Sequence, residues 1–464
     1  MDNTIIMPIF ESMNKIAKIS ITIIAATSAA IAYAQTGQER RAAIESQYGV
    51  KNAIVRYDTK KEIQETLSKI GAEYYMYEFD DVKMTPAPKG YKPVYISHIG
   101  RHGARYAIGD HVYERLKELF TKAKANGKLT PAGEDLLHKY EKLYPQVAFR
   151  GGDLTKAGQE QLRRIASVMY HSFPEVFRGK THAEILSTPI PRVMMSMVSF
   201  VDELRGLDRD FDFNVDASYA FYPIMEPNKT GSPVKVKVPL PEAVEKSKAE
   251  FKAARIDDES FCSRYFNDID FIKTEYGTWN FETDLRNVIV DLQCFDNDMK
   301  DSFEGIFTFD ELFNIWEVWN YNGYVYMGRT PLSDNRNCFN NATILKDMIE
   351  RAERDLQSGK TQLNLKFSHD TAILPLVSFM KLNNFGAVIN NPDEVKDFWR
   401  SFDIPMATNL QLIFYRSRRS PEILVKVLYN GREASLPFDE AFPSFYSWTD
   451  FKEYYGNLFK ESGI

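Results

Sequence analysis

Two short segments of the sequence hold most of the residues that could do chemistry. Arg101, His102 and Arg105 lie close together in one of them, and His369 and Asp370 are adjacent in the other. The guanidinium groups of arginines bind phosphate oxygens through paired hydrogen bonds. A neutral imidazole is a competent nucleophile toward phosphorus, and a carboxyl group can protonate a leaving oxygen and later activate water. These residue types point to phosphoryl transfer, with His102 as the nucleophile and Asp370 as the proton donor.

The charges around these residues set the pH at which such a reaction would run. Neighbouring cations disfavour the imidazolium ion, so we expect His102 to stay neutral to a lower pH than usual. Asp370 must carry a proton before it can donate one, and a bound phosphate dianion favours that form. We therefore expect an acidic working pH. Guanidinium groups can neutralise phosphate oxygens as Mg²⁺ does in other enzymes, so no metal ion and no cofactor is expected.

Three predicted strands lead into polar residues of this kind. The segment Val94–Tyr106 begins with β-branched and aromatic residues and continues into the first arginine-histidine turn. Leu363–Phe367 is a second strand, with His369 just after it, and Ala183–Thr188 is a third, followed closely by Arg192. Ligands of open α/β sheets bind beyond the carboxyl ends of the strands. We therefore expect Arg192 at the same rim, where it adds a third guanidinium group.

Helix-like segments separate these strands. One is His111–Ala125, another follows Thr155 as its N-cap, and a third begins near Pro191. This alternation indicates an α/β fold with a mostly parallel central sheet flanked by helices. Two antiparallel strands, Leu410–Tyr415 and Ile423–Tyr429, are expected to close the sheet. The inner face predicted for the helix after Pro191 consists of Met194, Met197, Val198 and Val201.

The first residues have the composition of a secretory leader. Two lysines precede an apolar run from Ile19 to Ile31, and Ala32-Tyr33-Ala34 supplies a cleavage site. The run is too short to span a bilayer comfortably. We therefore predict a signal peptide over residues 1–34 and an exported protein, either periplasmic or secreted. Whether translation starts at Met1 or Met13 stays open.

The rest of the chain divides by its composition. Residues 35–226 and 331–464 carry the strand–helix pattern, and we assign them to the two parts of one α/β domain. Lys, Glu and Ala dominate Pro239–Arg255, and helical patterns continue to Asn320 with little strand signal. Residues 227–330 are therefore predicted to form a mainly helical cap inserted into the α/β domain.

Overall charge limits the kind of partner. The formal net charge is −6 and no long block of Lys or Arg is present, which argues against non-specific nucleic-acid binding. The expected partner is an anionic small-molecule phosphomonoester, with no membrane contact after cleavage of the leader; the oligomeric state is open. Cys262, Cys294 and Cys338 lack the spacing of a zinc site. They can be buried thiols, or two of them can form a disulfide.

Several motifs resemble those of a known family. Arg101-His102-Gly103-Ala104-Arg105-Tyr106 resembles the Arg-His-Gly-x-Arg-x signature of the histidine acid phosphatases, and Ser368-His369-Asp370-Thr371 resembles their His-Asp pair. Further matches occur in the family's order between Val94 and Arg416, and any one of them alone would be weak. They are Leu154-Thr155-x-x-Gly158, Arg192 with Ser196 downstream, and Asn409-Leu410-Gln411.

The resemblance implies a phosphoglycerate-mutase-like fold and a phosphohistidine intermediate on His102. It also implies that Asp370 is the proton donor. The phosphate ligands that it implies are Arg101, Arg105, Arg192 and His369.

Within branch 2 of the histidine phosphatase superfamily, the chain is most similar to multiple inositol-polyphosphate phosphatases and phytases. Ile373-Leu374-Pro375-Leu376 resembles that group, although the group commonly has His-Ala-Glu where this chain has His369-Asp370. Inositol polyphosphates such as phytate are therefore the expected substrates, with sugar phosphates or nucleotides as the alternative. A non-catalytic protein that binds phosphorylated ligands is a third possibility. Cations that could bind further phosphates include Lys229, Lys235, Lys237 and Lys246.

Other histidines have simpler interpretations. His98 lies within the first strand, where a structural role is expected. His182-Ala183-Glu184 spells the acid motif of the inositol group, but it precedes a strand, so we place it at the far end of the sheet. His111, His138 and His171 lie in helix-like segments and are expected at the surface or in packing contacts.

Overall fold

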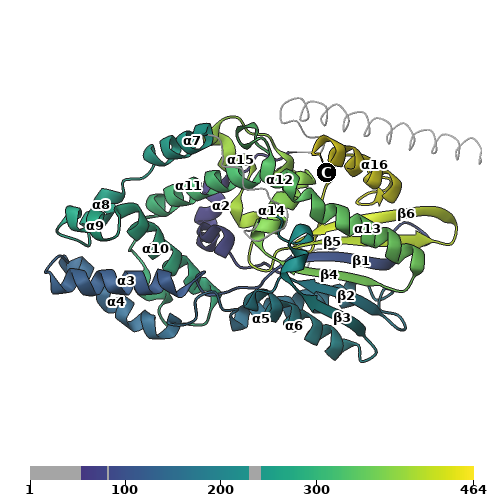
Figure 1. Ribbon diagram of the computed structural model, residues 1–464, viewed down its shortest axis with the longest axis horizontal. Helices are drawn as coiled ribbons and strands as arrows, with labels where there is room; N and C mark the ends of the chain where they lie inside the picture. Colours follow the sequence, from purple (N-terminus) through teal and green to yellow (C-terminus); the bar gives the residue numbers. More distant parts are fainter. Residues whose placement is uncertain (1–53, 81–82, 229–241, 464) are drawn as a thin grey trace, which may run out of the picture.

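The computed structural model describes residues 54–80, 83–228 and 242–463 (Figure 1). The predicted leader over residues 1–34 lies outside these ranges, as do Lys229, Lys235 and Lys237.

An eight-stranded sheet forms the centre of the fold, with strand order β3-β2-β4-β1-β5-β6-β7 and with β8 paired to β6 (Figure 1). The strands β3, β2, β4 and β1 run parallel, and β5 to β8 form an antiparallel edge. The parallel strands are β1 (Tyr91–Arg101), β2 (His182–Ser187), β3 (Asp212–Ala217) and β4 (Leu363–Ser368). The antiparallel ones are β5 (Asn409–Ser417), β6 (Ser420–Tyr429), β7 (Arg432–Glu433) and β8 (Tyr446–Ser447). The predicted α/β fold is confirmed.

Helices cover both faces of this sheet because successive side chains of a strand point to opposite sides. Tyr95 and Ile99 of β1 belong to one core, and Ile96 between them belongs to the other. The first core contains residues of α13 (Ala342–Ser358), α14 (Asp370–Phe379) and α16 (Trp448–Glu461). The second contains residues of α5 (Lys156–Ser172) and α6 (Pro191–Leu207).

The predicted inner face of α6 is partly wrong. Met197 and Val201 are buried, but Val198 is 51% exposed and Met194 is only half-buried. Apolar residues surround much of this helix, so periodicity alone does not identify the packed stripe. The stripe that packs against the sheet is Val193, Met197, Phe200, Val201 and Leu204.

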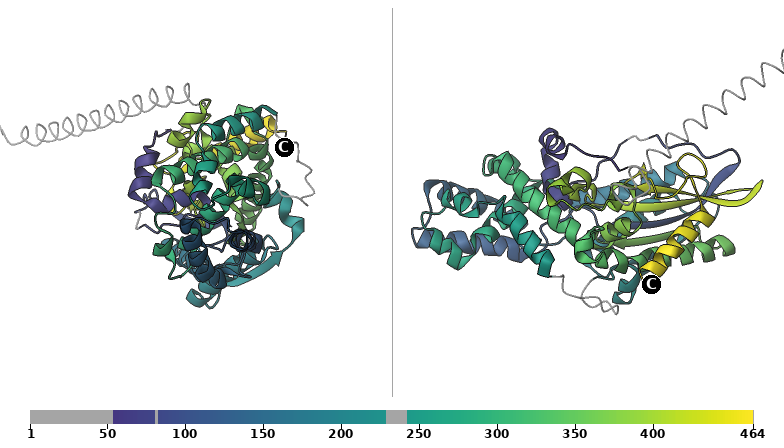
Figure 2. Two further views of the ribbon diagram at one scale, coloured as in Figure 1. Left: turned by 90° about the vertical axis from the view of Figure 1, so that its left-hand side faces the viewer. Right: turned by 90° about the horizontal axis from the view of Figure 1, so that it is seen from above.

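Helices dominate the described residues between 242 and 327. They are α7 (Glu242–Ala253), α8 (Asp258–Ser263), α9 (Ile269–Glu275), α10 (Thr278–Asp291) and α11 (Phe309–Met327). α3 (Asp110–Ala125) and α4 (Pro131–Val147) share a core with α8, α9 and α10 (Figures 1 and 2). The helical end of the molecule therefore also uses residues that we assigned to the first part of the α/β domain.

All three cysteines are buried free thiols, so the disulfide alternative is wrong. Among the described helices, none is both long enough and apolar enough to cross a membrane.

Candidate active site

The predicted site residues follow strands that end side by side. Arg101 at the end of β1 is in register with Ser368 at the end of β4, and Ser187 of β2 is in register with Phe367. The turns after β1 and β4 and the start of α6 therefore leave the sheet at the same level. This placement brings together all six residues that the sequence singled out: Arg101, His102, Arg105, Arg192, His369 and Asp370.

Arg101 is the most firmly held of these side chains. It is fully buried, and its Nη1 donates to the backbone oxygens of Glu73 at 2.7 Å and Ile404 at 3.0 Å. Its Nη2 donates to Oδ2 of Asp370 at 3.0 Å. The other carboxylate oxygen of Asp370 accepts from the N–H of Thr371 at 3.0 Å. Both residues are thus fixed relative to each other and to the backbone.

Burial and neighbouring positive charges act on the pKa of Asp370 in opposite directions. Burial alone would raise the pKa of the carboxyl group, but Arg101, Arg105 and His369 outweigh burial and lower the pKa to about 2. Asp370 is therefore ionised in the ligand-free site.

His102 has the tautomer that a nucleophile needs. Its Nδ1 lies 2.9 Å from the carbonyl oxygen of Gly103. Because a carbonyl oxygen can only accept, Nδ1 carries the proton and Nε2 keeps its lone pair. Burial, followed by Arg101, Arg192 and the other nearby cations, holds the pKa of His102 well below its usual value. The ring of His369 stands edge-on to that of His102, with centroids 5.6 Å apart.

Arg105 and Arg192 complete a positively charged cluster. The guanidinium group of Arg105 lies 4.9 Å from the ring centre of Tyr74 and donates to the backbone oxygen of Tyr106. Burial and the charge of Arg105 lower the pKa of Arg192 to about 10. Within the described part of the chain, neither Arg105 nor Arg192 forms an ion pair closer than 4 Å. Their charge is thus left to attract an anion.

Close backbone contacts shape the turn that carries His102. A Cβ on Gly103 would stand 2.3 Å from the carbonyl oxygen of Gly158, and a Cβ on Gly158 would stand 2.2 Å from that of Ala104. Thr155 caps α5 by accepting from the N–H of Gly158, and its hydroxyl donates to the oxygen of Ala104. These contacts explain why the Leu154-Thr155-x-x-Gly158 motif accompanies the histidine turn.

Ser196 ties the same turn to Arg192. Its hydroxyl accepts from the N–H of Gly103 at 3.1 Å and donates to the backbone oxygen of Arg192 at 2.8 Å. This hydrogen bond within α6 accounts for the spacing of Arg192 and Ser196 in the sequence.

Sequence reasoning missed two buried carboxyl groups near the site. Glu226 is 1% exposed and accepts from the hydroxyls of Ser368 and Thr371, which flank the His-Asp pair. Asp291 accepts from Tyr113 at 3.0 Å and interacts electrostatically with Arg105. Neither lies in a recognisable motif, so no local signal could have found them.

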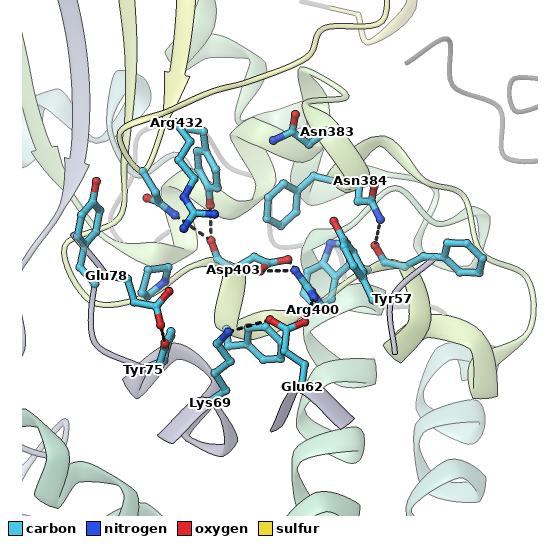
Figure 3. A pocket seen from close by; sticks show the side chains of 18 of the residues that line it. Tyr57, Glu62, Lys69, Tyr75, Glu78, Asn383, Asn384, Arg400, Asp403 and Arg432 are labelled. Atoms are coloured by element: carbon cyan, nitrogen blue, oxygen red, sulfur yellow. Dashed lines mark hydrogen bonds and ion pairs between the residues drawn. The ribbon is translucent and has the colours of Figure 1, made fainter. Parts of the chain in front are cut away.

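Two pockets accompany the cluster. One, of about 340 Å³, is lined by Asp370 and Thr371 together with residues of α11. The other, of about 290 Å³, is shown in Figure 3; none of the six predicted residues lines it.

The pocket of Figure 3 holds charges that neutralise one another. Glu62 accepts from Lys69 at 2.8 Å and from Arg400, and Arg400 makes two hydrogen bonds to Asp403 (Figure 3). Its walls include Asp403 and Pro405, which flank Ile404, one of the carbonyl acceptors of Arg101. This network therefore supports the segments that hold Arg101 rather than forming a second anion site.

The remaining candidates lie apart from the cluster. His182 is at the start of β2, opposite the strand end that faces the site, and it contacts Glu184 and Asp212, as expected. His98 is buried within β1, and His111, His138 and His171 are exposed on helices. Lys246 is exposed and paired with Glu250 at 3.8 Å.

Comparison with known proteins identifies the family of this chain. A model of the histidine phosphatase superfamily (branch 2) matches residues 96–430, more than half of the chain. The chain belongs to this family. No curated protein matches its sequence.

Solved structures share the fold at low sequence identity. A multiple inositol polyphosphate phosphatase from Bifidobacterium longum, in complex with inositol hexasulfate, has a TM-score of 0.65 at 17% identity, with 83% of this chain and 97% of that chain covered. The same enzyme in complex with phosphate gives 0.66 at 16% identity, with 84% and 98% covered. The phytase from D. castellii gives 0.59 at 15% identity, with 84% and 85% covered.

Proposed function

We propose that this histidine phosphatase hydrolyses phosphomonoesters through a phosphohistidine on His102. The observation that carries the proposal is the state of His102: a neutral, buried imidazole with its lone pair on Nε2, beside three arginines and one carboxylate. A protein that only bound phosphate would need neither a nucleophile nor a proton donor.

The reaction has two displacements. Arg101, Arg105 and Arg192 bind the phosphoryl oxygens with His369, and Nε2 of His102 attacks phosphorus while the bond to the leaving oxygen breaks. Asp370, after taking up the proton that the substrate monoanion brings to the site, gives it to that oxygen. In the second step the Asp370 carboxylate takes a proton from water, the oxygen of that water forms a bond to phosphorus, and the bond to His102 breaks. Each proton transfer is worth about 10²–10⁴-fold in rate.

We also propose inositol polyphosphates as the substrate class and export as the destination. The fold of the Bifidobacterium longum and D. castellii enzymes supports the first. The lysine-flanked apolar run before Gln35 supports the second. Sugar phosphates are the second candidate, favoured by the apolar residues that line the pocket beside Asp370.

The test is phosphate release by the purified mature protein from phytate and glucose 1-phosphate across pH, with His102→Ala as the inactive control. Asp370→Asn should accumulate a phosphoenzyme after brief mixing with substrate, because breakdown of the intermediate loses its base. No release from any ester would contradict the proposal, as would undiminished release by His102→Ala.

A further inference from the structure

The pocket of about 340 Å³ adjoins the charged cluster on the side of the carboxyl group. Asp370 and Thr371 line it, whereas His102 and the three arginines are not among its described lining residues. Most of its remaining surface is aromatic or aliphatic. These side chains are Trp319, Tyr326, Met327, Leu374 and Trp399.

This position matches the place of a leaving group. In a phosphoryl transfer the attacking atom and the leaving oxygen stand roughly in line on opposite sides of phosphorus. His102 attacks from one side, so the leaving oxygen has to lie on the side of Asp370, which protonates it. The organic part of the substrate then extends into the pocket that Asp370 lines.

The charges of this pocket disfavour additional phosphates. Its lining includes the carboxyl groups of Asp370 and Glu73 and one described cation, Lys248. The Nζ of Lys248 lies 3.2 Å from both carboxylate oxygens of Glu245. Among the described lining residues, a second phosphate would therefore meet two carboxylates and one lysine that is already paired with Glu245.

Polar atoms in the lining suit hydroxyl groups instead. Asn322, Thr371 and Ser401 add polar side chains to the lining, and uncharged groups of this kind can hydrogen-bond hydroxyl groups. Ligand sites commonly combine apolar walls with a few polar groups of this kind.

We propose that this pocket binds the organic part of the substrate and selects a ring with free hydroxyl groups beside the reacting phosphate over a fully phosphorylated ring. Partly phosphorylated inositols and sugar phosphates fit this description, and inositol hexakisphosphate does not. The inference rests on the proposed function, since a leaving-group pocket matters only if His102 and Asp370 hydrolyse the ester.

The first experiment compares kcat/KM for glucose 1-phosphate, an inositol bisphosphate and inositol hexakisphosphate. We expect the first two to exceed the third by roughly tenfold. A preference for inositol hexakisphosphate would overturn the inference while leaving the proposed phosphatase chemistry intact. Failure to hydrolyse any of the three would overturn the proposed function instead.

The second experiment substitutes residues that line the pocket. It divides kcat/KM for an ester by the rate of a reaction that needs only the charged cluster. Oxygen exchange between inorganic phosphate and isotopically labelled water uses the charged cluster with water, instead of an organic alcohol, as the leaving group. In Tyr326→Ala, at a side chain that is 43% exposed, kcat/KM for glucose 1-phosphate divided by the exchange rate should fall about three- to tenfold. Gly323 also lines the pocket, so Gly323→Leu places a side chain there and should lower the same ratio, although its Cβ, 3.1 Å from Trp399, requires a small shift of that ring.

Phe442→Ala is the matched control, since Phe442 is 45% exposed and contacts Tyr91 at the start of β1, the opposite end of that strand from the cluster. It should leave the ratio unchanged. A ratio that is also unchanged in Tyr326→Ala and Gly323→Leu would overturn the inference.

Discussion

Arg101 donates a hydrogen bond to Asp370 at 3.0 Å, and with the neighbouring cations it outweighs burial and lowers the pKa of this carboxyl group to about 2. Before substrate binds, Asp370 therefore carries no proton at pH 4 to 7, although the first displacement needs one for the leaving oxygen. The next group that can supply it is the substrate, because the second pKa of a phosphate monoester is about 6.

The first prediction concerns the pH dependence that follows. The value of kcat/KM should fall as pH rises through the second pKa of the substrate, because the dianion brings no proton to the site. We expect this alkaline limb to move when two monoesters of different second pKa are compared. Steady-state profiles from pH 4 to 9 measure it. If kcat/KM falls at the same pH for both esters, the proton comes from a group of the enzyme and not from the substrate.

Gly158 gives a prediction in which two effects oppose each other. Alanine in place of glycine within a helix normally stabilises by about 0.5–1 kcal/mol. At Gly158 the added Cβ would stand 2.2 Å from the backbone oxygen of Ala104, which cannot move without displacing the histidine turn. We therefore expect Gly158→Ala to lower both the unfolding free energy and kcat. Gly456→Ala in α16 is the control, because a Cβ there meets nothing within 4 Å and should be neutral or stabilising. Equal behaviour of the two variants in urea unfolding would contradict this account.

Ser196→Ala tests the link between α6 and the histidine turn. The change leaves the buried N–H of Gly103 without its acceptor, which costs about 1–3 kcal/mol of unfolding free energy. The change also removes the hydrogen bond to the backbone oxygen of Arg192. Arg192 is then held less firmly, so the Ki of inorganic phosphate as an inhibitor should rise. Ser199→Ala is the matched control, since the hydroxyl of Ser199 is buried in the same helix and only donates to the backbone oxygen of Met195. The prediction fails if both variants bind phosphate equally well.

Much of this site could be predicted from the sequence because its signals are local. β1 and β4 are buried strands, and the polar residues of the site lie at or directly after their ends. Predicting the two strands therefore also places these residues. The Thr155 cap was also predictable, because the hydroxyl and the helix that it caps are adjacent in sequence. The roles assigned to the six residues of the cluster stay predictions until they are tested.

Features that depend on tertiary packing were not predictable. β3 alternates polar and apolar residues as strands do, but it is short and mostly exposed at the edge of the sheet, and the sequence analysis missed it. The packing of α3 and α4 against α10 joins segments more than a hundred residues apart, which no local periodicity encodes. Glu226 is distant from the His-Asp pair in the sequence, and only the tertiary fold brings its carboxylate to the hydroxyl of Ser368.

The last prediction concerns a buried histidine outside the proposed chemistry. His98 packs against Phe200 and Phe367, and neither of its ring nitrogens has a hydrogen-bond partner among the described residues. Burial lowers its pKa from 6.5 to about 3. The stability that such a group contributes is complete above pH 6.5 and is lost as pH falls toward 3, because the unfolded chain binds the proton first. Between pH 7 and 4.5, the unfolding free energy should therefore fall about 2–3 kcal/mol more in the wild type than in His98→Leu. Urea unfolding at the two pH values measures this difference, and His138→Leu at an exposed helical position should behave like the wild type. The same pH dependence in wild type and His98→Leu would mean that the ring can take up a proton without leaving its place in the sheet.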